Sequence, residues 1–114
     1  MTNSRRKGKD GELEACRLLR QLGFPAARRM QQYCGKEGHA DVAGVPGLHL
    51  EVKRMRRVRI QNHLLGQAVD ECKDGDLPCL LSREDGSEWV FSCRLVDLPA
   101  VAEVVVRERV LECK

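Results

Sequence analysis

The sequence lacks a long apolar run, and this absence limits where the protein can reside. Among its 114 residues, no apolar stretch approaches the roughly 18 residues of a membrane-spanning helix. The basic start, MTNSRRKGKDGE, is not followed by the apolar segment that secretory signal peptides carry. We therefore expect a cytosolic protein with no membrane partner.

Paired cysteine motifs are absent as well. The chain has six cysteines, at positions 16, 34, 72, 79, 93 and 113, but no CxxC motif and no spacing typical of zinc sites. Disulfides are not expected either, because thiols stay reduced in the cytosol. We interpret the cysteines as small hydrophobic residues on helices (Cys16, Cys72) and in or beside strands (Cys79, Cys93).

Internal repeats, low-complexity tracts and linkers are also missing. A chain of 114 residues and 12.9 kDa is large enough to bury one hydrophobic core. The sequence therefore predicts a basic N-terminal arm, residues 1–8, followed by a single domain, residues 9–114.

The net charge of +3 conceals two halves of opposite sign. Residues 1–60 hold 14 Lys and Arg against 6 Asp and Glu, whereas residues 61–114 hold 6 against 11. The basic residues gather in three runs, at 5–9, 28–29 and 53–59. Such runs indicate a polyanionic partner, nucleic acid first of all. The alternative is a solvated charged face.

Hydrophobic periodicity and turn residues predict alternating helices and strands. Helices are expected over residues 10–22, 61–73 and 99–112, with glycine after the first two and proline at the start of the third. Strands are expected over residues 24–32, 39–45, 48–54, 79–83 and 88–92. This order, αβββαββα, predicts an α/β domain with one central mixed sheet flanked by helices.

The segment GHADVAGVPGLHLEVKR, residues 38–54, concentrates charged side chains on one predicted hairpin. Its second arm alternates strictly, so His49, Glu51 and Lys53 share one face. Asp41 comes level with Glu51 when the hairpin closes. Because Mg²⁺ usually binds through one or two carboxylates, this pair is a candidate metal site with Lys53 beside it. Each residue alone is equally compatible with surface charge, but the joint pattern D-x9-E-x-K is more specific.

The first predicted helix directs one of its two glutamates towards the protein body. At about 100° per residue, Glu12 lies on the apolar arc with Ala15, Cys16 and Leu19, and Glu14 lies on the opposite side, in solvent. An inward carboxylate needs a cation, a hydrogen-bond donor or a metal. Alternatively, Glu12 occupies the first turn, where an acidic residue suits the helix dipole.

Glu12, Asp41 and the tripeptide Glu51-Val52-Lys53 together resemble the PD-(D/E)xK nuclease superfamily. The closer resemblance is to archaeal-type Holliday junction resolvases and their phage relatives. Their RKG…E…LL…GF pattern is matched by residues 6–8, Glu12, residues 18–19 and residues 23–24. The resemblance covers about residues 5–92 and implies a restriction-endonuclease-like core.

The resemblance also implies an activity and residue roles. It implies a Mg²⁺- or Mn²⁺-dependent endonuclease, of prokaryotic or phage origin, that hydrolyses branched DNA as a homodimer and leaves a 5′-phosphate. Glu12, Asp41 and Glu51 would be the metal-site carboxylates, and Lys53 the catalytic lysine. The DNA contacts implied by the resemblance, or expected from the basic run after Lys53, are Arg6, Lys7, Arg28 (with Arg29 as the alternative), Arg54, Arg56, Arg57 and Arg59.

Other residues are expected beside the site rather than in it. Val52 separates Glu51 from Lys53, and Gln67 matches a glutamine that many relatives carry on the following helix, although a solvated position suits it equally. His49 shares the face of Glu51, and His39 has the strand parity of Asp41.

Apolar residues near the C-terminus predict a dimer interface. These are EWVFS, residues 88–92, and a valine-rich helix with Val101, Val104, Val105 and Val106. Trp89 is expected in the core or in this interface rather than stacked on a base.

Three departures from the resolvase pattern keep alternatives open. Ala40 stands where a proline precedes the motif aspartate, Leu13 stands where an arginine follows the helix glutamate, and residues 29–38 contain no serine. One alternative is a nuclease of the same fold that acts on flaps or DNA ends. Another is a DNA-binding module that does not cut.

Overall fold

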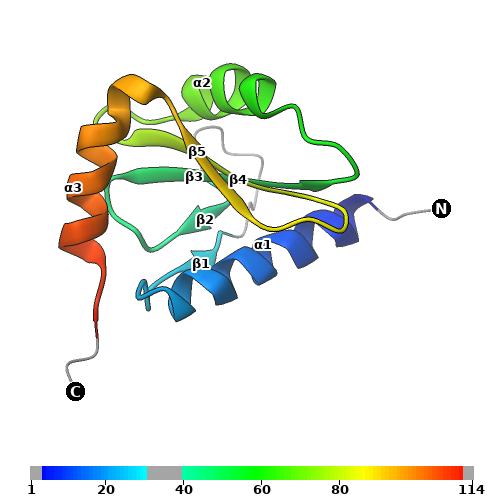
Figure 1. Ribbon diagram of the computed structural model, residues 1–114, viewed down its shortest axis with the longest axis horizontal. Coiled ribbons are helices and arrows are strands. Elements are labelled where there is room, and N and C mark those ends of the chain that lie inside the picture. The colour runs from blue at the N-terminus through cyan, green and yellow to red at the C-terminus, as the bar shows by residue number, and fades with distance from the viewer. Residues whose placement is uncertain (1–3, 31–39, 112–114) are drawn as a thin grey trace.

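A central sheet has helices on both of its faces (Figure 1) in the computed structural model, which describes residues 4–30 and 40–111. The elements in chain order are α1 (Ser4–Gln21), β1 (Arg28–Arg29), β2 (Val42–Ala43), β3 (Leu48–Met55), the π-helix η1 (Asn62–Ala68), α2 (Val69–Glu71), β4 (Leu77–Glu84), β5 (Val90–Cys93), the 3₁₀-helix η2 (Leu95–Asp97) and α3 (Leu98–Glu108). The predicted α/β class is confirmed. No helix within these residues is long and apolar enough to cross a membrane.

The five strands form one mixed sheet in the order β1-β2-β3-β4-β5. Neighbouring strands are antiparallel except β3 and β4, which run parallel over their whole length. A parallel pair needs a crossover, and η1 with α2 supplies it. The crossover packs on the face opposite α1, so β3 is covered on both sides (Figure 1).

Two apolar clusters occupy the two faces of the sheet. On one face, Leu50 and Val52 of β3 belong to the larger cluster with Ala15 and Cys16 of α1. On the other, Leu64 and Ala68 of η1 cover Leu80, which pairs in register with Glu51. Glu51 is therefore held beneath a helix rather than in solvent.

The β2–β3 connection is a tight turn, as the sequence predicts. The Leu48 N–H donates to the Val45 carbonyl at 3.1 Å, with Pro46 and Gly47 between them and Gly47 at φ 99°. Proline followed by a glycine of positive φ is the signature of a type II turn. This turn fixes the register in which β2 returns to β3.

Several boundaries differ from the prediction. β2 covers only Val42–Ala43 of the strand expected over 39–45, and the helix expected over 61–73 is the π-helix η1 followed by the short α2. Residues 4–8 belong to α1 and are not a loose arm, because they contain good helix formers and Gly8 alone does not break a helix. Within the described residues 24–30, the strand expected over 24–32 is limited to Arg28–Arg29 behind the turn at Gly23. α3 ends at Glu108, because the chain becomes extended at Arg109 and the Val110 N–H donates to the Gly23 carbonyl at 2.7 Å.

The valine-rich C-terminal helix is mainly a core element. Val101 and Val104 are buried in the larger cluster and Val105 packs against it, so the expectation that they form a dimer interface is wrong. Only Val106, of these four, is exposed.

The four described cysteines are free; Cys16 and Cys79 are buried, and Cys72 and Cys93 are half-buried. The end of the strand expected over 24–32, His39, Cys34 and Cys113 lie outside the described residues.

Candidate functional site

The β2–β3 hairpin brings Asp41 and Glu51 together. Val42 pairs with Leu50 in the antiparallel β2–β3 ladder, and Asp41 directly precedes β2, where its side chain is within hydrogen-bonding distance of the Glu51 carboxylate. The predicted carboxylate pair is confirmed as a spatial pair.

Backbone groups fix the position of Asp41. Its N–H donates to the Leu50 carbonyl at 3.0 Å, and its own carbonyl accepts the Met30 N–H at 2.9 Å. The Val52 N–H donates to Asp41 Oδ2 at 2.9 Å. Val52, expected beside the site, therefore acts through its backbone while its side chain is buried in the core.

Close packing of α1 on β3 places Glu12 near Asp41. Gly11 is buried, and a Cβ atom there would lie 2.9 Å from the Cβ of Arg54. The missing side chain lets the helix approach the strand. Arg29 Nε donates to Glu12 Oε1 at 2.6 Å, so the inward glutamate has a cationic partner, and Arg29 rather than Arg28 is the arginine at the site.

These residues border a groove of about 410 Å³. Its lining includes two of the predicted acids, Glu12 and Asp41, and four basic residues, Lys7, Lys53, Arg54 and Arg56. Burial, and then the nearby Asp41 carboxylate, raises the pKa of Glu12. A groove that joins acids to several cations can take a metal ion and a polyanion together.

Glu51 lies next to this groove, deeply buried among polar side chains. His49 Nε2 lies 2.8 Å from Glu51 Oε1, and Gln67 Nε2 donates to Glu51 Oε2 at 3.4 Å. Burial raises the pKa of Glu51 to about 10, with the Asp41 and Glu71 carboxylates adding to the effect. Gln67 therefore contacts the site and is not a solvated helix residue.

Glu71 belongs to this site and was not anticipated from the sequence. It lies on α2, half-buried, with a carboxylate oxygen close to His49 and Glu51. The signal that identifies it is helical spacing, because Glu71 follows Gln67 by four residues and so shares its face.

Some of the basic residues predicted to contact DNA line this groove, and others lie elsewhere on the surface. Arg54 packs under α1 with its Nε buried and without a hydrogen-bond partner, and it lies 3.7 Å from Glu14. Lys7 pairs with Asp85 at 2.9 Å. Arg28 is exposed and lines a separate groove around the β2–β3 turn. The remaining predicted contacts are exposed, namely Arg6, Arg56, Arg57 and Arg59.

Glu14 is not the solvated residue that the helical wheel predicts. It accepts a hydrogen bond from Trp89 Nε1 at 2.7 Å and is ion-paired with Arg83, joining α1 to β4 and to the start of β5. Although partial burial opposes it, these two donors lower the pKa of Glu14. The helical-wheel prediction for Glu14 was wrong because a wheel contains no information about which strands lie beside the helix.

We expect Glu14→Gln to lower the free energy of unfolding by about 1–3 kcal/mol, because it weakens charge-assisted hydrogen bonds and leaves Arg83 without its counter-ion. Urea unfolding followed by circular dichroism measures the change. Glu103→Gln, an exposed glutamate on α3, is the matched control and should leave the midpoint unchanged. Equal midpoints for the two variants would show that the Glu14 contacts add nothing to stability.

Comparison with known proteins adds no further constraint. No family model, no curated protein and no solved structure matches this chain. The chemistry of the groove and of its neighbouring carboxylates is therefore the basis for inferring a function.

Proposed function

We propose that the protein is a metal-dependent endonuclease of DNA with a restriction-endonuclease-like core. One observation carries the proposal: the carboxyl groups of Asp41 and Glu51 lie side by side, Lys53 is two residues further along β3, and Glu12 lines the same groove as Asp41 and Lys53. This is the arrangement that the PD-(D/E)xK resemblance leads one to expect. The αβββαββα order of the elements is consistent with it.

The donor set fits a hard divalent cation. Asp41, directly before β2, and Glu51, on β3, offer carboxylate oxygens, the ligands that Mg²⁺ and Mn²⁺ prefer. Neither carboxylate has a lysine or arginine ion-pair partner within residues 4–30 and 40–111. Such an ion, when bound, would polarise a phosphate oxygen and lower the pKa of a water molecule.

The remaining residues have roles set by their positions. Val52 N–H keeps the Asp41 carboxylate oriented, and Arg29 keeps Glu12 turned inward. Lys53 lines the groove, where its ammonium group would stabilise negative charge developing on a phosphate. Lys7 and Arg56 line the same groove and would bind the flanking phosphates.

Branched DNA and a homodimer form the finer part of the proposal. A chain of this size has room for one such site, and cutting a four-way junction needs two sites at a fixed spacing, which two-fold symmetry supplies. After the correction for α3, the predicted interface residues that remain exposed are Val90 and Phe91 of β5 and Val106 of α3. Flap or end cleavage by the same site is the second candidate function.

A module that binds DNA without cutting is the third candidate, and the acids count against it. Asp41, Glu51 and Glu71 place three carboxylates close together beside a basic groove. Asp41 and Glu12 line the groove itself, where negative charge opposes phosphate binding unless a metal ion lies between them, so the acids weaken a pure binding site and suit a metal site.

The deciding experiment is a cleavage assay of the purified protein. Labelled four-way junction, flap and linear duplex of the same sequence are incubated with Mg²⁺ or with EDTA. Symmetrical cuts in the junction, dependent on Mg²⁺, support the resolvase; cuts in all three substrates support a general nuclease. If no substrate is cut with either Mg²⁺ or Mn²⁺, the nuclease proposal fails.

The basic run after β3 should contribute phosphate contacts. We expect Arg56→Ala to weaken binding to every DNA shape and to reduce the slope of log K against log salt by about 0.9, the value for one lost contact with duplex DNA. Arg57→Ala and Arg59→Ala should behave likewise. Fluorescence anisotropy over a salt series measures the slope, and Arg17→Ala, at an exposed arginine of α1, is the control. An unchanged slope in all three variants would make the run a solvated face.

A further inference from the structure

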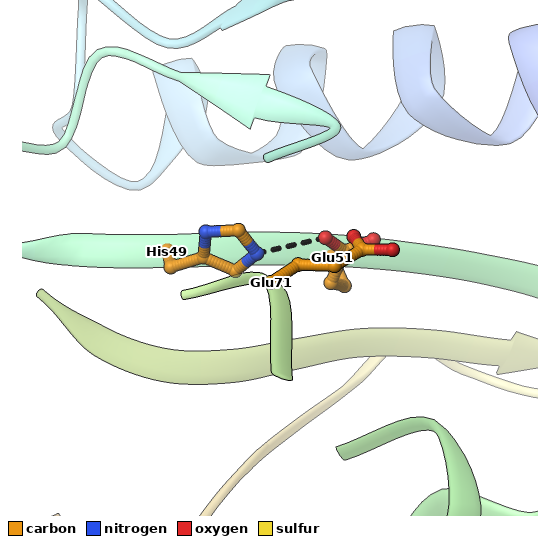
Figure 2. A group of neighbouring side chains, drawn as sticks. All are labelled: His49, Glu51 and Glu71. Carbon is orange, nitrogen blue, oxygen red and sulfur yellow. Dashed lines mark hydrogen bonds and ion pairs between the residues drawn. The ribbon is translucent and has the colours of Figure 1, made fainter. Parts of the chain in front are cut away.

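A second group of potential metal ligands lies on the side of Glu51 occupied by the crossover helix. His49 and Glu51 come from β3, and Glu71 reaches them from α2 (Figure 2). One donor atom from each residue lies within 4.8 Å of the other two. A single ion could therefore contact all three after small rotations of the side chains.

Burial makes this group unusual. The side chains of His49 and Glu51 are only 2% and 1% exposed, and Glu71 is half-buried. A buried carboxylate requires charge compensation. In the described part of the chain, neither Glu51 nor Glu71 forms an ion pair with lysine or arginine, and the amide of Gln67 is a neutral donor. The charge of the buried Glu51 is then balanced either by a proton, as its raised pKa indicates for the metal-free protein, or by a bound cation that displaces the proton.

The donor types indicate the class of ion. Mg²⁺ prefers oxygen ligands in octahedral geometry and retains several waters. Imidazole suits first-row transition ions, and carboxylates suit Mn²⁺ as well. A set of one imidazole and two carboxylates, largely closed to water, therefore favours a transition ion over Mg²⁺.

We propose that His49, Glu51 and Glu71 bind a divalent first-row transition ion at a position separate from the groove. The ion would join α2 to β3 and would share Glu51 with the Asp41–Glu51 site. This inference goes beyond the proposed nuclease, because the ion is expected to bind whether or not the protein cuts DNA.

Mn²⁺ is the probe, because it is paramagnetic and avoids the thiols of this cysteine-containing chain. Mn²⁺ is added to the metal-free protein and binding is followed by the loss of its free EPR signal. Pulsed EPR then detects modulation by an imidazole nitrogen, which carboxylate ligands at Asp41 and Glu12 cannot produce. Titration with Mg²⁺ measures the preference between the two ions.

We expect the wild type to bind Mn²⁺ more tightly than Mg²⁺ and to show nitrogen modulation. His49→Gln should remove the modulation, and Glu71→Gln should weaken this binding by about tenfold or more. If the His49→Gln variant does not fold, because His49 is more deeply buried, the Glu71→Gln variant alone tests the proposed metal site. The controls are Asp70→Asn, at the exposed neighbour on α2, and His63→Gln, on η1.

The inference is overturned if nitrogen modulation is absent from the wild type, if Glu71→Gln leaves the affinity for Mn²⁺ unchanged, or if His63→Gln removes the nitrogen modulation.

Failure of this metal site can be distinguished from failure of the nuclease proposal. Asp41→Asn should abolish Mg²⁺-dependent cleavage yet keep the nitrogen signal. A nitrogen signal without cleavage counts against the nuclease, and cleavage without it counts against the His49 site.

Discussion

Asp41→Asn is expected to abolish DNA cleavage while leaving DNA binding intact or stronger. The substitution removes a negative charge that faces the groove, and with it a proposed metal ligand. The asparagine carbonyl can still accept the Val52 N–H, so the local fold should survive. Single-turnover cleavage in Mg²⁺ should slow by about a thousandfold or more. Anisotropy in EDTA measures the binding.

Glu51→Gln should have the same effect on cleavage, and Asp74→Asn, in the exposed turn after α2, should have none. Lys53→Ala should also stop cleavage but retain metal binding measurable by calorimetry, because lysine is not a ligand. Near-normal cleavage by the Asp41 or Glu51 variant would remove both residues from the mechanism. Loss of metal binding in the Lys53 variant would make that lysine structural.

Gly44→Ala is expected to destabilise the whole domain. Gly44 has φ +104°, and a Cβ atom there would lie 1.9 Å from the Ala26 carbonyl oxygen, far inside any permitted contact. The strands β1 and β2 would have to separate, which displaces both Asp41 and Arg29. A loss of about 4 kcal/mol or more is expected, against a typical total of about 5–15 kcal/mol. Urea unfolding and cleavage should both show it.

Gly75→Ala is the matched control for this prediction. Gly75 also has positive φ, +94°, but no heavy atom lies within 4 Å of the added Cβ. It should therefore lose only the roughly 1–2 kcal/mol that a left-handed backbone costs an alanine. Similar losses at the two positions would mean that the Ala26 contact is relieved by a small shift.

The sequence by itself determined the hairpin and its carboxylate pair. Alternation along the strand predicted over 48–54 placed Glu51 and Lys53 on one face, and Pro46-Gly47 fixed the turn, so the closeness of Asp41 and Glu51 followed from local rules. The inward direction of Glu12 followed from helical period alone. These features depend on residues close together in the chain, where backbone geometry leaves few choices.

Only the tertiary structure decided which distant side chains meet. Glu14 bonds with Trp89, 75 residues away in the chain, and Arg29 rather than Arg28 meets Glu12. Glu71 joined the site because the crossover helix packs on the face of the sheet that carries Glu51 (Figure 2). Val101 is a core residue because α3 packs against the larger apolar cluster. Each outcome depends on how separate elements pack, and a periodic pattern gives the direction of a side chain but not what lies opposite it.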